Sequence, residues 1–328
     1  GAPPAAAPVP PAALRPLPGD VSDAELAHRV REDPSSLGPM SVGEPSSGAL
    51  VNGVQLRAGR GHELVDPANS WGTQETIEYL TRCIDAVQSR FPGTPKMQIG
   101  HLSARRGGHL SPHKSHQSGR DVDVSYYLRG SPRRWYRRAT EDGLDRPRSW
   151  AFVRAVLTET DVQYVFMNTS VQKLLKEYAF QIGEDPAWLD DVFQYQSHAG
   201  APIIRHAPGH DTHIHVRFFS PVAQELGRRA YPLLVEQGKI AAPVRYALHK
   251  AKSGDTLGSL ANRYETTVKA IQEANGLRSN RIYAKRIYRI PQRGQAEIRT
   301  APVRIPPRRL PPPGTPREPP SASASLIY

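Results

Sequence analysis

Two segments of the chain alternate polar and apolar residues with a period of two, which predicts half-buried β-strands. Residues 121–125 read Asp-Val-Asp-Val-Ser, and residues 213–218 read His-Ile-His-Val-Arg-Phe. Successive side chains of a strand point to opposite faces, so each segment gathers apolar residues on one face and carboxylates or imidazoles on the other. We therefore expect one face of each strand to enter the core and the other to line a polar site.

Other segments repeat their apolar residues at helical spacing. Residues 76–87, 150–157 and 171–179 show this pattern, and residues 162–167 between the last two predict a strand. Asn168 and the two residues after it offer N-cap chemistry for the helix that follows. Strands with polar faces and helices inserted between them predict an α+β domain.

Cys83 is the only cysteine of the chain, so no intramolecular disulfide can form. It lies on the apolar stripe of the predicted helix at residues 76–87. We expect a small buried hydrophobic side chain there, because no neighbouring residue is identified that would activate a thiol.

Proline is concentrated at both ends of the chain, which holds 32 Pro and 26 Gly. Residues 1–19 are almost wholly Ala, Pro, Val, Leu and Gly, and residues 306–313 read Pro-Pro-Arg-Arg-Leu-Pro-Pro-Pro. Such stretches cannot bury a core, so we expect a disordered arm at 1–40 and a disordered tail at 294–328. The remaining part, about 250 residues, suffices for one full domain and one small one.

The net charge of +12, from 43 Lys and Arg against 31 Asp and Glu, favours anionic partners. The densest basic-aromatic run, residues 133–138, is compatible with stacking on sugars or bases and equally with a solvated loop. No nucleic-acid-binding motif is recognisable, so nucleic acid is not favoured as a partner. No run of eighteen apolar residues predicts a transmembrane segment, and no secretory signal is visible at the N-terminus, which begins with Gly1.

Histidines gather in two short windows, which hold seven of the twelve in the chain. Two imidazoles and one carboxylate suit catalytic zinc, because they leave a fourth position for water. The alternatives to a catalytic zinc site are ordinary surface or hydrogen-bonded histidines, or a metal site without catalysis. Spacing alone does not choose between Asp121 and Asp123 as a ligand. The clustered histidines are His101, His109, His113, His116, His210, His213 and His215.

Residues 115–123 and 209–217 resemble the two signatures of the penicillin-insensitive murein endopeptidases, which belong to the LAS metallopeptidases. The resemblance runs from about Ser41 to about Phe219 and includes residues 103–108 just before the first signature. A histidine followed seven residues later by aspartate, with a later His-x-His, is specific when both occur together.

The resemblance implies zinc (Zn2+) bound by His116, Asp123 and His215, with His213 as a catalytic histidine that is not a ligand. It matches His113 and His210 to further active-site histidines. Asp121 corresponds to the first aspartate of the Asp-x-Asp signature, which is not expected to be a ligand.

A second unit begins near Tyr246, after both signatures are complete. The pattern predicts a β-α-α-β unit. After a first strand, we expect Asp255 to cap one helix, and a second helix to start at Thr266 or Thr267 and end at Asn275-Gly276. A strand at residues 287–291 closes the unit. Residues 253–257 and 275–277 resemble a LysM module, which implies binding to glycans that contain N-acetylglucosamine. Lys285-Arg286 departs from the family's usual Gly-Gln.

The sequence therefore predicts an LAS-type α+β metallopeptidase domain with an antiparallel sheet core at 41–235 and a LysM-like domain at 244–293. The two resemblances imply a zinc endopeptidase that cuts peptide cross-links of peptidoglycan in the periplasm or outside the cell. The alternatives are a non-catalytic wall-binding protein with a vestigial metal site, and a carboxypeptidase that acts on stem-peptide ends.

Overall fold

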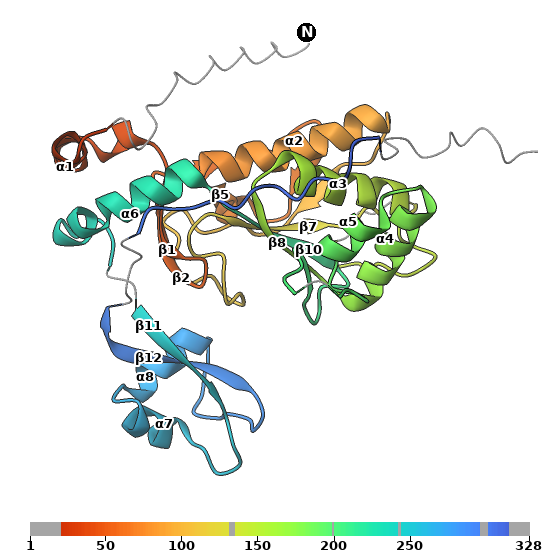
Figure 1. Ribbon diagram of the computed structural model, residues 1–328. Coiled ribbons are helices and arrows are strands. Elements are labelled where there is room, and N and C mark those ends of the chain that lie inside the picture. Colours follow the sequence, from red (N-terminus) through yellow and green to blue (C-terminus); the bar gives the residue numbers. More distant parts are fainter. Residues whose placement is uncertain (1–20, 131–134, 199, 242–243, 296–300, 315–328) are drawn as a thin grey trace, which may run out of the picture.

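The computed structural model describes residues 21–130, 135–198, 200–241, 244–295 and 301–314. It is a mixed α+β structure, as the sequence predicts, with a large body and a small second unit (Figure 1). The α-helices are α1 (Asp23–Glu32), α2 (Gln74–Arg90), α3 (Arg146–Glu159), α4 (Thr169–Gln181), α5 (Pro186–Val192), α6 (Pro221–Glu236), α7 (Leu257–Arg263) and α8 (Val268–Asn275), with 3-10 turns η1 (Pro34–Leu37) and η2 (Pro67–Asn69).

The strands form one large sheet and three small pairs. The large sheet has six strands in the order β4-β6-β7-β10-β8-β9; its four inner strands pair antiparallel, and β4 and β9 add in parallel at its edges. The antiparallel core predicted from the sequence is therefore confirmed. The strands are β1 (Met40–Glu44), β2 (Ser47–Val51), β3 (Val54–Gln55), β4 (His62–Leu64), β5 (Trp71–Gly72), β6 (Met97–Ile99), β7 (Asp121–Ser125), β8 (Val162–Met167), β9 (Ile204–His206), β10 (His213–Phe218), β11 (Val244–Lys250) and β12 (Ile287–Gln295).

Helices α2 and α3 cover one face of the large sheet (Figure 1). The apolar residues of β7 and β10 point to this side and join the main core, in which Cys83 is fully buried. Asn168 caps α4 by accepting a hydrogen bond from the Ser170 amide. The alternation that predicts the two strands therefore directs their polar residues to the opposite face, away from α2 and α3.

The expected disordered arm at 1–40 is wrong for its second half. Residues 1–20 lie outside the described residues, but α1 follows them and buries Leu26 and Val30 against α6. A nearby part of α6 lies so close to β1 that a Cβ atom at Gly227 would stand 2.1 Å from the Ser41 carbonyl oxygen. The proline-rich composition of the first nineteen residues concealed the amphipathic helix that begins at Asp23.

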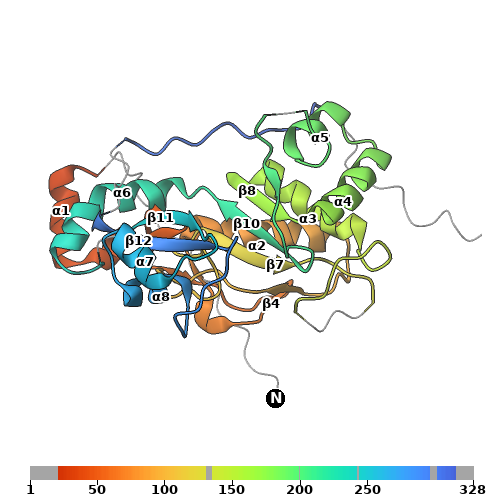
Figure 2. The ribbon, with the colours of Figure 1, turned by 90° about the horizontal axis from the view of Figure 1, so that it is seen from below.

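The expected disordered tail at 294–328 is also wrong for residues 301–314. This segment, which we call the strap, runs in an extended path from near α6 to α5 (Figure 2). Trp188 donates its indole N–H to the Arg309 carbonyl oxygen at 2.8 Å, and Arg308 pairs with Asp161 at 2.9 Å. Proline fixes an extended backbone in advance, so such a segment can bind a surface without forming a core of its own.

The second unit has its own core, built around Leu260, Ile271 and Tyr288. Thr267 caps α8, and Gly276 ends it in the left-handed conformation, as predicted. The expected cap by Asp255 is wrong: Thr256 caps α7, and Asp255 instead accepts hydrogen bonds from His249 and the Lys252 amide. The described helices include none that is long and apolar enough to span a bilayer.

Candidate metal centre

The register between β7 and β10 brings the two polar strand faces together. His215 lies directly opposite Asp123, and Arg217 lies opposite Asp121. Directly opposed side chains of antiparallel strands have Cβ atoms about 4.5–5.5 Å apart, within reach of one another. Two segments about ninety residues apart in sequence thus form one cluster of imidazoles, carboxylates and a guanidinium.

Asp123 lies at the centre of this cluster and is almost fully buried. Its Oδ1 atom is 3.3 Å from His116 Nε2 and 3.3 Å from His215 Nδ1. Two ligands of a tetrahedral zinc ion, each at about 2.0–2.1 Å from the metal, are about 3.3–3.4 Å apart. Both distances therefore fit ligands of one metal ion, and Asp121 also lies within ligand distance of the same two histidines.

His116 comes from the loop before β7 and presents one defined nitrogen to this centre. Its Nδ1 atom donates to the Leu102 carbonyl oxygen at 2.7 Å, which leaves the lone pair on Nε2. His116 Nε2 and Asp123 Oδ1 are both buried without a hydrogen-bond partner. Two facing acceptors that lack partners call for a cation between them, which is the polar signature of a metal site.

Asp121 is the second buried carboxylate, and its oxygens are already engaged. Arg217 donates to Oδ1 at 2.7 Å and to Oδ2 at 3.1 Å, and the backbone N–H of His116 donates to Oδ2 at 2.9 Å. His215 Nε2 lies 3.4 Å from Asp121 Oδ1 without forming a hydrogen bond, and this nitrogen is also buried without a partner. Asp121 therefore holds the backbone of His116 and has its positive partner in Arg217.

The charges in the cluster agree with these contacts. Burial raises the pKa of Asp123, but His116 and then His215 offset this and hold the pKa below its usual range. Burial likewise lowers the pKa of His116, and the adjacent Asp123 outweighs this effect and raises it. Arg217 outweighs burial at Asp121 and holds the pKa of that carboxyl well below its usual range. Both carboxylates are therefore ionised near neutral pH.

His213 stands beside this centre, with Nε2 3.9 Å from Asp123 Oδ1. Its Nδ1 atom is 3.0 Å from the Thr212 hydroxyl, and Tyr136 contacts the ring edge to face with centroids 5.4 Å apart. Burial lowers the pKa of His213 to about 4, so the imidazole is neutral at pH 7. His210 lies against it, with ring centroids 4.6 Å apart.

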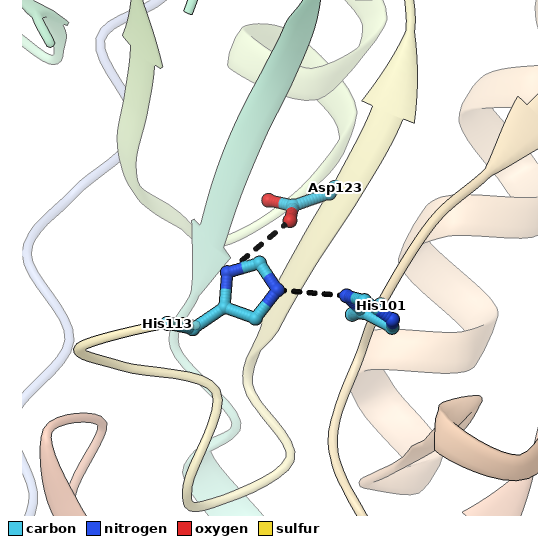
Figure 3. A group of neighbouring side chains, drawn as sticks. All are labelled: His101, His113 and Asp123. Carbon is cyan, nitrogen blue, oxygen red and sulfur yellow. Dashed lines mark hydrogen bonds and ion pairs between the residues drawn. The ribbon is translucent and has the colours of Figure 1, made fainter. Parts of the chain in front are cut away.

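His113 lies between Asp123 and His101, as Figure 3 shows. Its Nδ1 atom is 3.7 Å from Asp123 Oδ2, and its Nε2 atom is 2.7 Å from His101 Nδ1. Burial lowers the pKa of His113 to about 3, so this imidazole is also neutral at pH 7.

The structure thus brings together the predicted ligands and catalytic histidines, whereas His109, another of the clustered histidines, is exposed. Sequence reasoning missed three contributors: Trp135 and Tyr136, which wall His213, and Asp66, which contacts His101. The sequence showed the basic-aromatic run at 133–138 but not that it lies beside His213. Residues 133 and 134 lie outside the described residues. No sequence signal distinguished Asp66.

Comparisons with known proteins identify two families in the chain. Residues 41–239 match the family described as penicillin-insensitive murein endopeptidase, and residues 249–291 match the LysM domain. A penicillin-insensitive murein endopeptidase of Yersinia enterocolitica is 25% identical over 208 residues, which cover 57% of this chain and 69% of that protein. One of Pectobacterium atrosepticum is 25% identical over 219 residues, covering 60% and 69%.

Proposed function

The chain belongs to the family of penicillin-insensitive murein endopeptidases, and from this premise we propose that it is a zinc-dependent hydrolase of peptide cross-links in peptidoglycan. The observation that carries the proposal is the convergence of His116 Nε2, His215 Nδ1 and Asp123 Oδ1, with two of these atoms buried and unpartnered. The substrate lies outside the cytoplasmic membrane, so a periplasmic or secreted location follows from the proposal.

The proposed ligands are His116, Asp123 and His215. Asp123 is preferred to Asp121 because Arg217 already occupies the cationic position beside Asp121. When bound, zinc would lower the pKa of a coordinated water to about 7 and polarise the scissile carbonyl.

His213 is the proposed catalytic histidine. Its neutral Nε2 atom faces the centre, where it can accept a proton, and once protonated it can donate a hydrogen bond to a developing oxyanion. The aromatic rings of Trp135 and Tyr136 pack beside it, with centroids 6.0 and 5.4 Å from that of His213. His113 and His210 flank the site and contribute as neutral hydrogen-bonding groups.

The second unit is the proposed tether to the glycan strands. Holding an enzyme on an insoluble polymer raises the effective concentration of the bonds it cuts. The unit is linked to the catalytic body beside the β1–β2 hairpin, where the Ser47 hydroxyl donates to the Val244 carbonyl oxygen at 2.8 Å.

Digestion of intact sacculi by the zinc-loaded protein tests the proposal, with the released muropeptides identified by mass spectrometry. We expect cross-linked dimers to fall and their monomers to rise, and the His213→Ala variant to leave the dimers intact. Loss of terminal residues with dimers unchanged would instead identify a carboxypeptidase. No change at full zinc occupancy would identify a non-catalytic wall-binding protein.

A further inference from the structure

His101, His113 and Asp123 form a second group of metal-ligand side chains beside the proposed zinc site (Figure 3). Their geometry does not fit a second metal ion. His101 Nδ1 and His113 Nε2 are 2.7 Å apart, a hydrogen-bond distance, whereas two nitrogen ligands of one tetrahedral zinc ion stand about 3.3 Å apart. His113 also turns Nδ1, its other nitrogen, toward Asp123, and one imidazole cannot offer both nitrogens to a single ion.

The group is instead part of a hydrogen-bonded chain that begins at Asp66. Asp66 Oδ2 is 3.1 Å from His101 Nε2, and His101 Nδ1 in turn contacts His113 Nε2. The exposed fraction of the side chains falls along this chain, from 32% at Asp66 and 25% at His101 to 13% at His113 and 1% at Asp123. The chain therefore leads from the surface to the metal centre.

Asp66 fixes the direction of this chain. It precedes η2, where its Oδ1 atom accepts the Ala68 amide at 3.1 Å and its Oδ2 atom accepts the Asn69 side-chain amide at 2.7 Å. The hydrogen bond from Asn69, and the adjacent His101, lower the pKa of Asp66, so it is an ionised acceptor. An acceptor at this end requires a proton on His101 Nε2.

The remaining protons follow from this first one. A neutral His101 with a proton on Nε2 has its lone pair on Nδ1, so it accepts a hydrogen bond from His113 Nε2. A neutral His113 with a proton on Nε2 has its own lone pair on Nδ1, the atom that faces Asp123. The orientation and the tautomer of His113 are thus both determined by two residues outside the metal centre.

We propose that Asp66 and His101 are positioning residues that hold His113 with its Nε2 atom protonated and its Nδ1 lone pair presented to the metal centre. The inference rests on the proposed function for the role of His113, which would accept a hydrogen bond from water or substrate at Nδ1. Its tautomer is measurable without any peptidase assay.

Imidazole 15N chemical shifts of the full-length zinc-loaded protein, recorded at pH 8 where free histidine is neutral, test the proposal. The His113 signals are assigned from their absence in His113→Asn. We expect a protonated Nε2 and an unprotonated Nδ1 in the unmodified protein, and a mixture of both tautomers in His101→Leu. A proton on Nδ1 in the unmodified protein, or the same single tautomer in His101→Leu, overturns the proposal.

His101→Gln is the conservative variant, because its amide supplies one donor for Asp66 and one acceptor for His113. We expect it to restore the tautomer of the unmodified protein. His109→Leu is the matched control, since His109 lies in the same loop and is exposed. It should leave the spectrum of His113 unchanged.

The same variants give a kinetic readout. The loss of an outer hydrogen-bond partner typically costs 10–100-fold in activity, so we expect kcat on soluble muropeptides to fall by about that factor in His101→Leu and to recover largely in His101→Gln. Zinc content should stay near one ion per chain in both. Loss of zinc in His101→Leu would make His101 part of a metal site and contradict its proposed role as a positioning residue. Inactivity of every variant and of the unmodified protein would refute the proposed function and leave the tautomer result intact.

Discussion

Asp121 and Asp123 lie two residues apart on one strand face, yet their surroundings give them different chemistry. Arg217 and the His116 amide engage the oxygens of Asp121, whereas Asp123 keeps a buried oxygen without a partner. Removal of one partner of a buried ion pair leaves an uncompensated charge, whereas a buried carboxylate oxygen without a partner can accept a cation. This difference underlies the first two predictions.

Removal of the proposed ligands should abolish metal binding. Elemental analysis of protein purified without chelator should give about one zinc per chain, and the His116→Ala/Asp123→Ala double variant should give none. The control His109→Ala/Asp142→Ala changes the same two residue types at exposed positions and should retain the metal. Full zinc in the first double variant would refute the ligand assignment.

Substitution of Asp121 should destabilise the fold rather than act on the metal alone. Asp121→Asn leaves the Arg217 guanidinium, 18% exposed, without its anionic partner. Breaking a buried ion pair typically costs about 3–5 kcal/mol, so the free energy of unfolding of the catalytic body should fall by roughly that amount. Chemical denaturation of the metal-free protein measures it, with Asp123→Asn as the comparison. An equal loss in both variants would contradict the distinction between the two carboxylates.

His213→Ala should retain the metal and lose turnover. His213 lies 3.9 Å from Asp123 Oδ1, farther than the proposed ligands, and the removal of one general acid–base group typically lowers the rate 10²–10⁴-fold. Steady-state kinetics on soluble muropeptides, beside zinc analysis of the same sample, measure both effects. If zinc is lost together with activity, His213 is itself a ligand and the proposed roles are wrong.

Among the elements, helix α6 packs directly against β1 of the β1–β2 hairpin and against α1. It buries Leu226, Ala230 and Leu234 against α1 and β1, and Gly227 permits backbone contact with Ser41. Helix α7 in the second unit also contains a glycine, Gly258, but a Cβ atom there would meet nothing closer than 3.8 Å. The two glycines thus have the same local conformation and opposite packing environments.

Alanine at these two glycines should change stability in opposite directions. Gly227→Ala forces a Cβ atom against the Ser41 backbone, and overpacking of this kind typically costs about 1–3 kcal/mol. Gly258→Ala gains helix propensity worth about 0.8–1.0 kcal/mol without a clash. Differential scanning calorimetry should show a lower melting temperature for the catalytic body in the first variant and a higher one for the second unit in the other. Stabilisation by Gly227→Ala would show that α6 and β1 can separate at little cost.

At the scale of the whole molecule, the chain leaves the catalytic body after α6 and folds into the second unit. The strap then runs from near α6 to α5 (Figure 2), with hydrogen bonds to Glu225 and Trp188. The second unit is therefore connected to the catalytic body at both of its ends. A comparison of truncations has to separate the effect of the second unit from that of the strap.

Two truncations make this separation. A chain ending at residue 295 lacks the strap, and one ending at residue 241 lacks both the strap and the second unit. We expect both to cleave soluble muropeptides with zinc bound, and only the shorter one to lose sedimentation with insoluble sacculi, because it alone lacks the tether. The strap should contribute stability alone, through contacts such as that between Trp188 and Arg309. Equal sedimentation of both truncations would shift wall binding to the catalytic body.

Salt distinguishes glycan recognition from charge attraction in this experiment. The net charge of +12 attracts an anionic wall, and such attraction is screened over a Debye length of about 3 Å at 1 M salt. Binding by residues 244–295 alone should persist at that salt concentration if the unit recognises neutral sugars. Complete release of the unit from the wall at 1 M salt would mean that it binds by charge alone. In that case the replacement of the usual Gly-Gln by Lys285-Arg286 would have removed glycan recognition.

The sequence by itself determined the local features of this protein. The period of two in β7 and β10, the helical stripe around Cys83 and the caps of α4 and α8 follow from neighbouring residues, and all are present in the structure. The paired signatures also predicted the family, because their residue types and spacings are specific.

Only the tertiary structure decided what depends on contacts between distant segments. The register of β7 against β10 pairs Arg217 with Asp121 and thereby distinguishes it from Asp123, a choice that spacing leaves open. The proline-rich composition of the two ends did not predict that α1 and the strap pack on the catalytic body. Composition indicates low local order, but it does not show whether the folded body offers a surface on which such a segment can bind. Asp66 lies 35 residues before His101, and only folding places it where its charge can set the tautomers of two histidines. Interactions between neighbouring residues determine the helices and strands, whereas the direction of hydrogen bonds and the pairing of charges depend on which of these elements come into contact.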